Sequence, residues 1–338
     1  MIGVRTRQFL RRTLIALGSR PKAVEGPPRL HEQHVAAPPP GNNWPLPPDE
    51  AERLFSQAPI ELISLEPTSH GVAGALKAKT AFPHDGRRLE VKWKVAPPGT
   101  MDGWNNSPRK EIATYFVQRW FLEPQDYVVP TVALRAVPIA AYRRLDPKAT
   151  PTVDGTQCIV GTLALWLQHT TVPDVLYDQA RFGTEPDYAY HLSNFNVLAY
   201  LVAHRDGRSG NILVADTDTN RRVFAVDNGI SFGGWVYNFL TTNWHIIRVA
   251  AIRGEVVRRL RSIHRDALSA LATLVELQVD ADGLLRPVRA GPPIDPDRGV
   301  RITPGRIQLG LTIAEIETAA RRISALLERV DEGSLAVF

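Results

Sequence analysis

The chain has 338 residues, of which 44% are hydrophobic and 22% charged, and its formal net charge is +5. This composition is typical of a globular protein that holds either one large two-lobed domain or two ordinary ones. It excludes a transmembrane span, because no apolar run reaches about 18 residues, and it argues against a nucleic-acid partner, because the basic residues are scattered without interleaved aromatics.

Cysteine usage points to a reducing compartment. Cys158 is the only cysteine, so no intramolecular disulfide is possible, and its apolar surroundings are typical of a small buried side chain. We therefore expect a cytoplasmic protein. Residues 1–25 form a basic segment that leaves two alternatives open: a targeting signal, or an amphipathic helix lying on the protein or on a membrane surface.

Residues 26–50 are rich in proline and predict a linker or an extended strap. Three strands are expected after it, at residues 61–65, 75–80 and 89–95. Gly71 and Gly74 lie in the turn between the first two strands. A turn with two glycines lets backbone amides come close to a phosphate, although turns of this kind are common in proteins that bind none.

The third expected strand carries Lys92 and Lys94 on one face and apolar residues on the other. Either ammonium group can reach the phosphates of a nucleotide, so the alternation alone does not choose between them. We favour Lys94, because it ends an apolar-x-apolar-Lys run directly before Val95-Ala96-Pro97, where the strand should stop.

Ser107-Pro108 predicts the start of a helix that runs to Trp120, with serine as the N-cap and proline in the first turn. Glu111 falls near that start and has two interpretations. It pairs with a lysine of the third strand, which we favour, or it only complements the positive end of the helix. Residues 126–135 and 157–167 predict two more strands.

His204-Arg205-Asp206 is followed by Asn211, and Asp227-Asn228-Gly229 lies further along the chain. The first group resembles the catalytic loop of protein kinases, and the second resembles their metal-binding Asp-x-Gly motif. Phosphoryl transfer needs one carboxylate to orient the attacking hydroxyl, and a second carboxylate and an amide oxygen to hold metal ions. Asp206 suits the first role, and Asp227 and Asn211 suit the others.

The segments around this constellation support it. Residues 211–214 and 222–226 predict a hairpin that delivers Asp227. A second triplet, His264-Arg265-Asp266, lacks the following asparagine and lies in a stretch of helical period, so we interpret it as a helix surface.

The C-terminal part is expected to be mostly helical. Residues 244–277 have helical period, residues 278–308 look irregular, and Thr312-Ile313-Ala314-Glu315 is a capping box that opens a last helix reaching about Val330. We interpret these segments as packing elements without a chemical role.

Two motifs extend the likeness to a known superfamily. Arg109-Lys110-Glu111-Ile112-Ala113-x-Tyr115 is similar to the glutamate-bearing helix of the Golgi casein kinases, and residues 226–233 are similar to their Asp-Asn-Gly motif with its following Phe-Gly. The chain thus resembles the atypical kinases of the protein-kinase-like superfamily, which include the phosphatidylinositol 3- and 4-kinases, the HipA-type kinases and the Golgi casein kinases. Asn211 is closer to the phosphatidylinositol kinase pattern, and no Ala-Pro-Glu follows Asp227.

The resemblance covers roughly residues 60 to 235 and implies an α+β, two-lobed protein-kinase-like fold. Its small N-lobe would be an antiparallel sheet with one key helix, and its C-lobe mostly helical. We place the N-lobe and hinge at residues 51–167 and the C-lobe at residues 168–338.

The implied activity is an ATP- and Mg²⁺- or Mn²⁺-dependent transfer of the γ-phosphoryl group to a hydroxyl of a protein, lipid or small-molecule acceptor. Lys94 would hold the phosphates with Lys92 as the alternative, Glu111 would position that lysine, and Gly71 and Gly74 would approach the nucleotide. Two alternatives remain: a nucleotide-binding pseudokinase that acts as a scaffold, and a kinase-like enzyme that transfers AMP.

Overall fold

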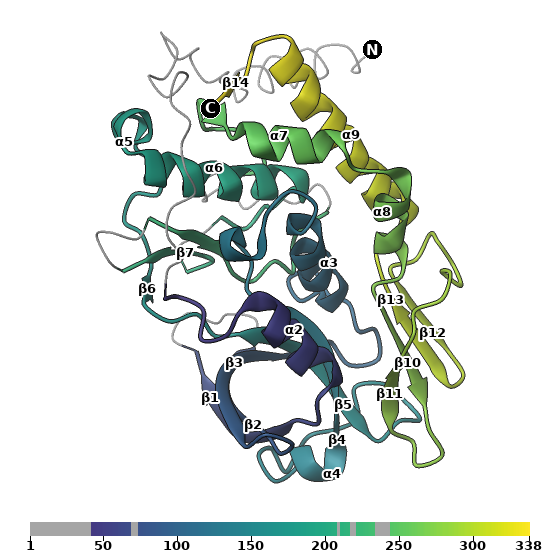
Figure 1. Cartoon of the computed structure of the whole chain (residues 1–338). Helices are drawn as coiled ribbons and strands as arrows, with labels where there is room; N and C mark the ends of the chain where they lie inside the picture. Colours follow the sequence, from purple (N-terminus) through teal and green to yellow (C-terminus); the bar gives the residue numbers. More distant parts are fainter. Residues whose placement is uncertain (1–41, 69–73, 208–209, 217–220, 234–243) are drawn as a thin grey trace, which may run out of the picture.

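The computed structural model describes residues 42–68, 74–207, 210–216, 221–233 and 244–338. Helices pack against antiparallel sheets, with one short parallel pair near the C-terminus (Figure 1). The expected mixture of helix and antiparallel sheet is therefore confirmed. Within the described residues, no helix is long and apolar enough to cross a membrane.

A five-stranded antiparallel sheet, in the order β1-β2-β3-β5-β4, lies in the first half of the chain. Its strands are β1 (Glu61–Pro67), β2 (Ala75–Phe82), β3 (Arg87–Val95), β4 (Val132–Pro138) and β5 (Cys158–Leu165). Strands were expected at all five places, but the one expected at residues 126–135 starts later. The amide oxygen of Gln118 accepts hydrogen bonds from the backbone N–H groups of Val128 and Val129, at 2.9 and 2.8 Å, so this stretch pairs with a helix side chain.

One face of this sheet is covered by α2 (Pro48–Gln57), which begins inside the segment expected to be a linker. Proline at its start and two acidic residues in its first turn favour a helix there. The helix buries Leu54 and Phe55 in a core with Phe82 and Trp93. The guanidinium of Arg135 on β4 binds the carbonyl oxygens at the end of the helix, which fixes α2 to the sheet.

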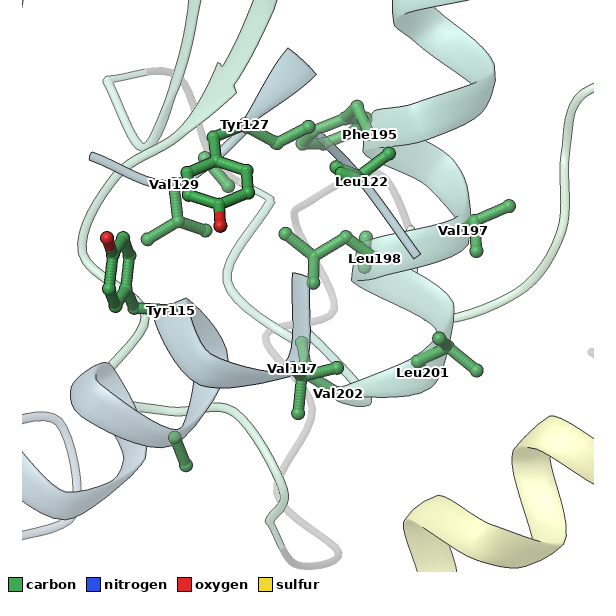
Figure 2. Packing of buried hydrophobic residues seen from close by; sticks show 14 of the residues in the cluster. Tyr115, Val117, Leu122, Tyr127, Val129, Phe195, Val197, Leu198, Leu201 and Val202 are labelled. Atoms are coloured by element: carbon green, nitrogen blue, oxygen red, sulfur yellow. The ribbon is translucent and has the colours of Figure 1, made fainter. Parts of the chain in front are cut away.

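The helix α3 (Pro108–Gln118) lies between the sheet and α6 (Pro186–Leu201). Residues on nearly every side of α6 are buried, as expected of a helix in the middle of a core. Figure 2 shows how α3, the segment after it and α6 contribute to this core: Tyr115, Val117, Leu122, Tyr127, Val129, Phe195, Val197, Leu198, Leu201 and Val202.

A three-stranded antiparallel sheet lies beside α6, in the order β6-β7-β8. Its strands are β6 (Thr170–Thr171), β7 (Ile212–Ala215) and β8 (Val223–Ala225). The last two form the hairpin expected between the catalytic-loop motif and Asp227, so that prediction is confirmed. A short helix, α5 (Gln179–Thr184), precedes α6. Small elements α4 (Ile139–Tyr142) and η2 (Pro124–Asp126) flank β4.

The continuous helical region expected at residues 244–277 is wrong. The chain there forms β9 (Ala251–Ile252), α7 (Gly254–Arg261), α8 (Arg265–Ser269) and η3 (Ala270–Ala272). The reason lies in α6, where the amide oxygen of Asn196 accepts from the backbone N–H groups of Arg248 and Val249, at 2.7 and 3.1 Å. These backbone groups are paired outside any helix. The second His-Arg-Asp triplet does lie on an exposed helix surface, because α8 buries none of its residues.

The irregular segment expected at residues 278–308 is also wrong, because it contributes to a four-stranded antiparallel sheet in the order β11-β10-β13-β12. Its strands are β10 (Val275–Val279), β11 (Leu285–Val288), β12 (Val300–Thr303) and β13 (Arg306–Leu309). Gly283 and Gly305 have φ values of 76° at the two hairpin turns, a conformation that glycine adopts without strain. The C-terminal half is therefore less helical than the resemblance implied.

The last helix, α9 (Ile313–Asp331), opens with the expected capping box. Thr312 Oγ1 accepts from the backbone of Glu315, and the Glu315 carboxylate accepts from the backbone of Thr312. The chain then ends in β14 (Ala336–Val337), which pairs with β9. Cys158 is buried, its Sγ accepts from the backbone N–H of Leu285, and burial raises the pKa of its thiol, so the structure gives it a packing role.

We expect Gln118→Met to destabilise the protein by about 2–4 kcal/mol, because it keeps the volume of the side chain but leaves buried backbone groups of Val128 and Val129 unpaired. Chemical denaturation monitored by circular dichroism measures the change. The matched control is Gln278→Met at an exposed position of β10, expected within about 0.5 kcal/mol of the wild type. Equal stability of the two variants would contradict this role of Gln118.

Candidate active site

A cavity of about 810 Å³ lies between the five-stranded sheet and the β6-β7-β8 sheet. Its volume is in the range of sites that bind nucleotides and similar small molecules. Apolar side chains line much of it: Ala75, Val129, Val132, Ala164, Leu165, Leu167, Leu213 and Val226. Polar side chains at its wall include Lys92, Glu111, Asn211, Asp227 and Asn228.

An ion pair joins β3 to α3 at this wall. Lys92 Nζ lies 3.0 Å from Oε1 and 3.3 Å from Oε2 of Glu111. Burial alone would lower the pKa of Lys92, but the carboxylates of Glu111 and Asp227 outweigh it and leave the pKa raised. Lys92 therefore stays a cation inside the protein, and its charge lies at the cavity wall.

The expected pair between Lys94 and Glu111 is wrong, and Lys92 takes that place. Glu111 lies within the first turn of α3, level with Lys92. Lys94 lies level with the loop that precedes the helix, where its Nζ donates to the backbone oxygen of Asn105 at 3.1 Å. A difference of two positions along a strand is a shift of about 7 Å, so one helix turn can meet only one of the lysines.

Lys94 is instead paired with Asp227. Its Nζ lies 2.8 Å from Asp227 Oδ1, and the side chain is only 1% exposed. Lys92 Nζ is 3.9 Å from the same oxygen. Burial alone would raise the pKa of Asp227, but the two ammonium groups hold it well below its usual range. Asp227 is therefore a carboxylate at any physiological pH.

The backbone around Asp227 is held in an unusual conformation. Asp227 has a φ of 61°, which is uncommon for residues other than glycine and recurs at functional sites. The N–H of Val226 donates to the carbonyl of Asn211, which ties the segment to the hairpin. A side chain at Gly229 would put its Cβ 3.2 Å from the backbone nitrogen of Ser107, so the close approach to the start of α3 favours glycine.

Asp206 and Asn211, next to the Asp227 segment, are hydrogen-bonded to each other. The amide nitrogen of Asn211 donates to Asp206 Oδ2 at 2.8 Å and to its backbone oxygen at 3.1 Å. Both side chains are buried, and Asn211 lines the cavity. Because the nitrogen of the amide is used by Asp206, the amide oxygen is the atom that Asn211 can offer to a cation.

The glycine turn is described only in part. Gly71 lies outside the described residues. Gly74 has a φ of 72° directly before β2, where Ala75 lines the cavity. The expected nearness of the turn to the cavity therefore concerns Gly74 alone.

Asn228 is a polar cavity residue that the motif contains but that we did not single out as a ligand. Its amide nitrogen donates to the carbonyl of Ala225, while its buried amide oxygen has no hydrogen-bond partner among the described residues. Burial without a partner costs free energy, so this oxygen is a candidate to receive a hydrogen bond from a ligand or water. The signal in the sequence was its position inside Asp-Asn-Gly.

The oxygen atoms of Asp227 and Asn211 suit Mg²⁺ or Mn²⁺, which prefer carboxylate, carbonyl and water ligands. The described part of the chain contains no cluster of three or more His, Cys, Asp or Glu side chains that could hold a metal. A site with few protein ligands is typical of Mg²⁺ bound together with the phosphates of a substrate. The residues present fit such a metal.

No protein-family model and no curated protein matches the chain. A crystal structure of the Golgi casein kinase matches it with a TM-score of 0.46 and 13% identity, over 84% of this chain and 74% of that one. The Golgi casein kinase with Mn/ADP bound matches with a TM-score of 0.47 and 12% identity, over 86% and 78%. Likenesses this distant add no argument about function, which depends on the geometry of the site.

We expect the His204→Leu variant to lose less folding stability than the wild type when the pH is lowered from 7 to 4. Burial lowers the pKa of His204 from 6.5 to about 4 in the folded protein. As the pH falls, His204 therefore takes up a proton in the unfolded protein at a higher pH than in the folded protein. The contribution of neutral His204 to the free energy of unfolding is complete above about pH 6.5 and is lost as the pH falls towards 4. The loss amounts to about 3 kcal/mol.

Denaturation curves between pH 7 and pH 4 measure this difference. His84→Leu, at an exposed position on the β2–β3 turn, is the control and should keep the wild-type slope. The slope of His204→Leu should be shallower than that of both. A slope identical to the wild type would show that His204 is not held neutral.

Proposed function

We propose that the chain is an ATP- and Mg²⁺- or Mn²⁺-dependent phosphotransferase with a two-lobed, kinase-like arrangement. The observation that carries this proposal is the ion pair of Lys92 and Glu111, which faces the carboxylate of Asp227 at the wall of one nucleotide-sized cavity. Kinases use a strand lysine, a helix glutamate and a metal-binding aspartate in this combination. The bond between Asp206 and Asn211 adds the remaining polar pair.

Each group then has a separate role. Lys92, fixed by Glu111, binds the phosphates of the nucleotide. Asp227 and the amide oxygen of Asn211 would hold the metal, which would supply positive charge to offset that of the triphosphate. Asp206 orients the acceptor hydroxyl and takes its proton, while the hydroxyl oxygen bonds to the γ-phosphorus and the bond to the ADP oxygen breaks. These roles keep four of the expected site residues and exchange the two lysines.

The arrangement of the lobes is part of the proposal. The five-stranded sheet with α2 and α3 would be the small lobe, and the chain after residue 168 the large one. The segment before α2 is bound to the proposed boundary between the two lobes. The side-chain amide of Asn43 donates to the carbonyls of Gln168 and His169 at 3.0 and 2.8 Å. The strap expected at residues 26–50 would then brace the hinge with its last residues.

A nucleotide-binding protein without catalysis is the second candidate. The observation in its favour is the 2.8 Å contact between Lys94 and Asp227, which engages an oxygen of the proposed metal ligand. Transfer of AMP instead of the γ-phosphoryl group is a third outcome that needs the same residues. Both are distinguished from phosphoryl transfer by which part of ATP reaches an acceptor.

We expect label from γ-labelled ATP, but not from α-labelled ATP, to reach an acceptor when the protein is incubated with Mg²⁺ or Mn²⁺ and a lysate. Asp206→Ala should abolish this transfer and leave nucleotide binding nearly intact. Asp266→Ala is the matched control, because it lies in the second His-Arg-Asp triplet on an exposed helix. Transfer of the α-label would establish the AMP reaction, and binding without any transfer would favour the scaffold.

We expect Lys92→Met to lower the rate of transfer by about two orders of magnitude or more, because it removes the cation that meets the phosphates. Lys79→Met, at an exposed position of β2 that does not line the cavity, should leave the rate unchanged. A rate of Lys92→Met within about tenfold of the wild type would contradict the assignment.

Asp227→Ala should remove the rise in melting temperature that ATP with Mg²⁺ produces in the wild type, because a ligand stabilises a protein only as far as it binds. Thermal denaturation with and without Mg-ATP measures it. A melting-temperature rise of the wild-type size in Asp227→Ala would exclude Asp227 as the metal ligand.

A further inference from the structure

β3 brings a second lysine to the site, and its surroundings differ from those of the first. Lys92 pairs with a helix glutamate and lines the cavity. Lys94 is buried and pairs with Asp227, the proposed metal ligand. One strand lysine is enough to bind phosphates in a kinase-like site. The second ammonium group therefore calls for a different role.

The position of Lys94 does not depend on Asp227 alone. Its Nζ also donates to the backbone oxygen of Asn105 at 3.1 Å. The loop that supplies this oxygen is fixed in turn, because the amide of Asn106 donates to the carbonyl of Val95 at 2.8 Å. The ammonium group is thus held between β3 and the β3–α3 loop, and a long, flexible side chain has become a fixed charge.

The fixed charge changes the electrostatics at Asp227. Its carboxylate faces ammonium groups at 2.8 and 3.9 Å, and Oδ1 is the oxygen that both approach. Protein kinases hold two metal ions between the corresponding aspartate and asparagine, and these ions neutralise the triphosphate. Here one unit of positive charge is already built into that position, beside Oδ1 of the carboxylate.

We propose that Lys94 supplies at Asp227 the positive charge that a second divalent ion would bring, so that the site binds a nucleoside triphosphate with one divalent metal ion. This inference rests on the proposed function and goes beyond it, because it assigns a separate role to the buried lysine. Lys94 acts on the phosphates through its fixed charge, and Lys92 contacts them.

The test counts metal ions in the wild-type complex. Mn²⁺ is titrated, with electron paramagnetic resonance detection of the free ion, into protein saturated with a non-hydrolysable ATP analogue. One bound Mn²⁺ per nucleotide is expected. Two bound ions, or none, would overturn the inference.

A variant adds a second readout. Lys94→Met is expected to weaken binding of the same analogue in EDTA by about tenfold or more, and to weaken it less in Mn²⁺, because the metal restores part of the missing charge. Lys79→Met is the control and should bind as the wild type does in both buffers. Equal losses for Lys94→Met in the two buffers would overturn the inference.

The two proposals fail in different ways. If the wild type binds no nucleotide, the proposed function falls. If it binds nucleotide with two Mn²⁺ ions, the phosphotransferase proposal stands and only the role of Lys94 falls. If Lys94→Met does not fold, as a flat melting curve would show, the count of ions on the wild type still decides.

Discussion

The site depends on opposite charges that are buried beside one another. Lys92 and Lys94 reach it from β3, Glu111 from α3 and Asp227 from the end of the β7–β8 hairpin. A lone charge in this position would be costly to bury, and removing one partner leaves the other uncompensated. The sheet, the helix and the hairpin must therefore keep fixed positions relative to one another so that these charges stay paired. The cavity lies where the three elements meet.

Much of this arrangement follows from short-range patterns. The alternation in β3 predicts two lysines on one face, Ser107-Pro108 predicts the start of α3, and the polar turn after Val214 predicts the hairpin that ends at Asp227. The capping box at Thr312 predicts α9. In each case neighbouring residues along the chain decide the local structure, so the sequence alone is informative.

Other features depend on contacts between distant residues. Glu111 meets Lys92 because of where α3 starts relative to β3, a matter of about 7 Å that the alternation of one strand does not determine. Gln118 and Asn196 bind backbone groups of other segments, which prevents the strand and the helix that local periodicity predicts at residues 126–131 and 246–249. The sheet at residues 275–309 forms through pairing between four short strands joined by turns such as those at Gly283 and Gly305, and the sequence of one short strand does not show its partners.

A crystal structure with Mn²⁺ and a non-hydrolysable ATP analogue tests the central claim most directly. The account predicts the triphosphate in the 810 Å³ cavity with its phosphate oxygens on Lys92, and an anomalous manganese peak in coordination distance of Asp227. A nucleotide bound outside this cavity, or a manganese peak away from both Asp227 and Asn211, would contradict it.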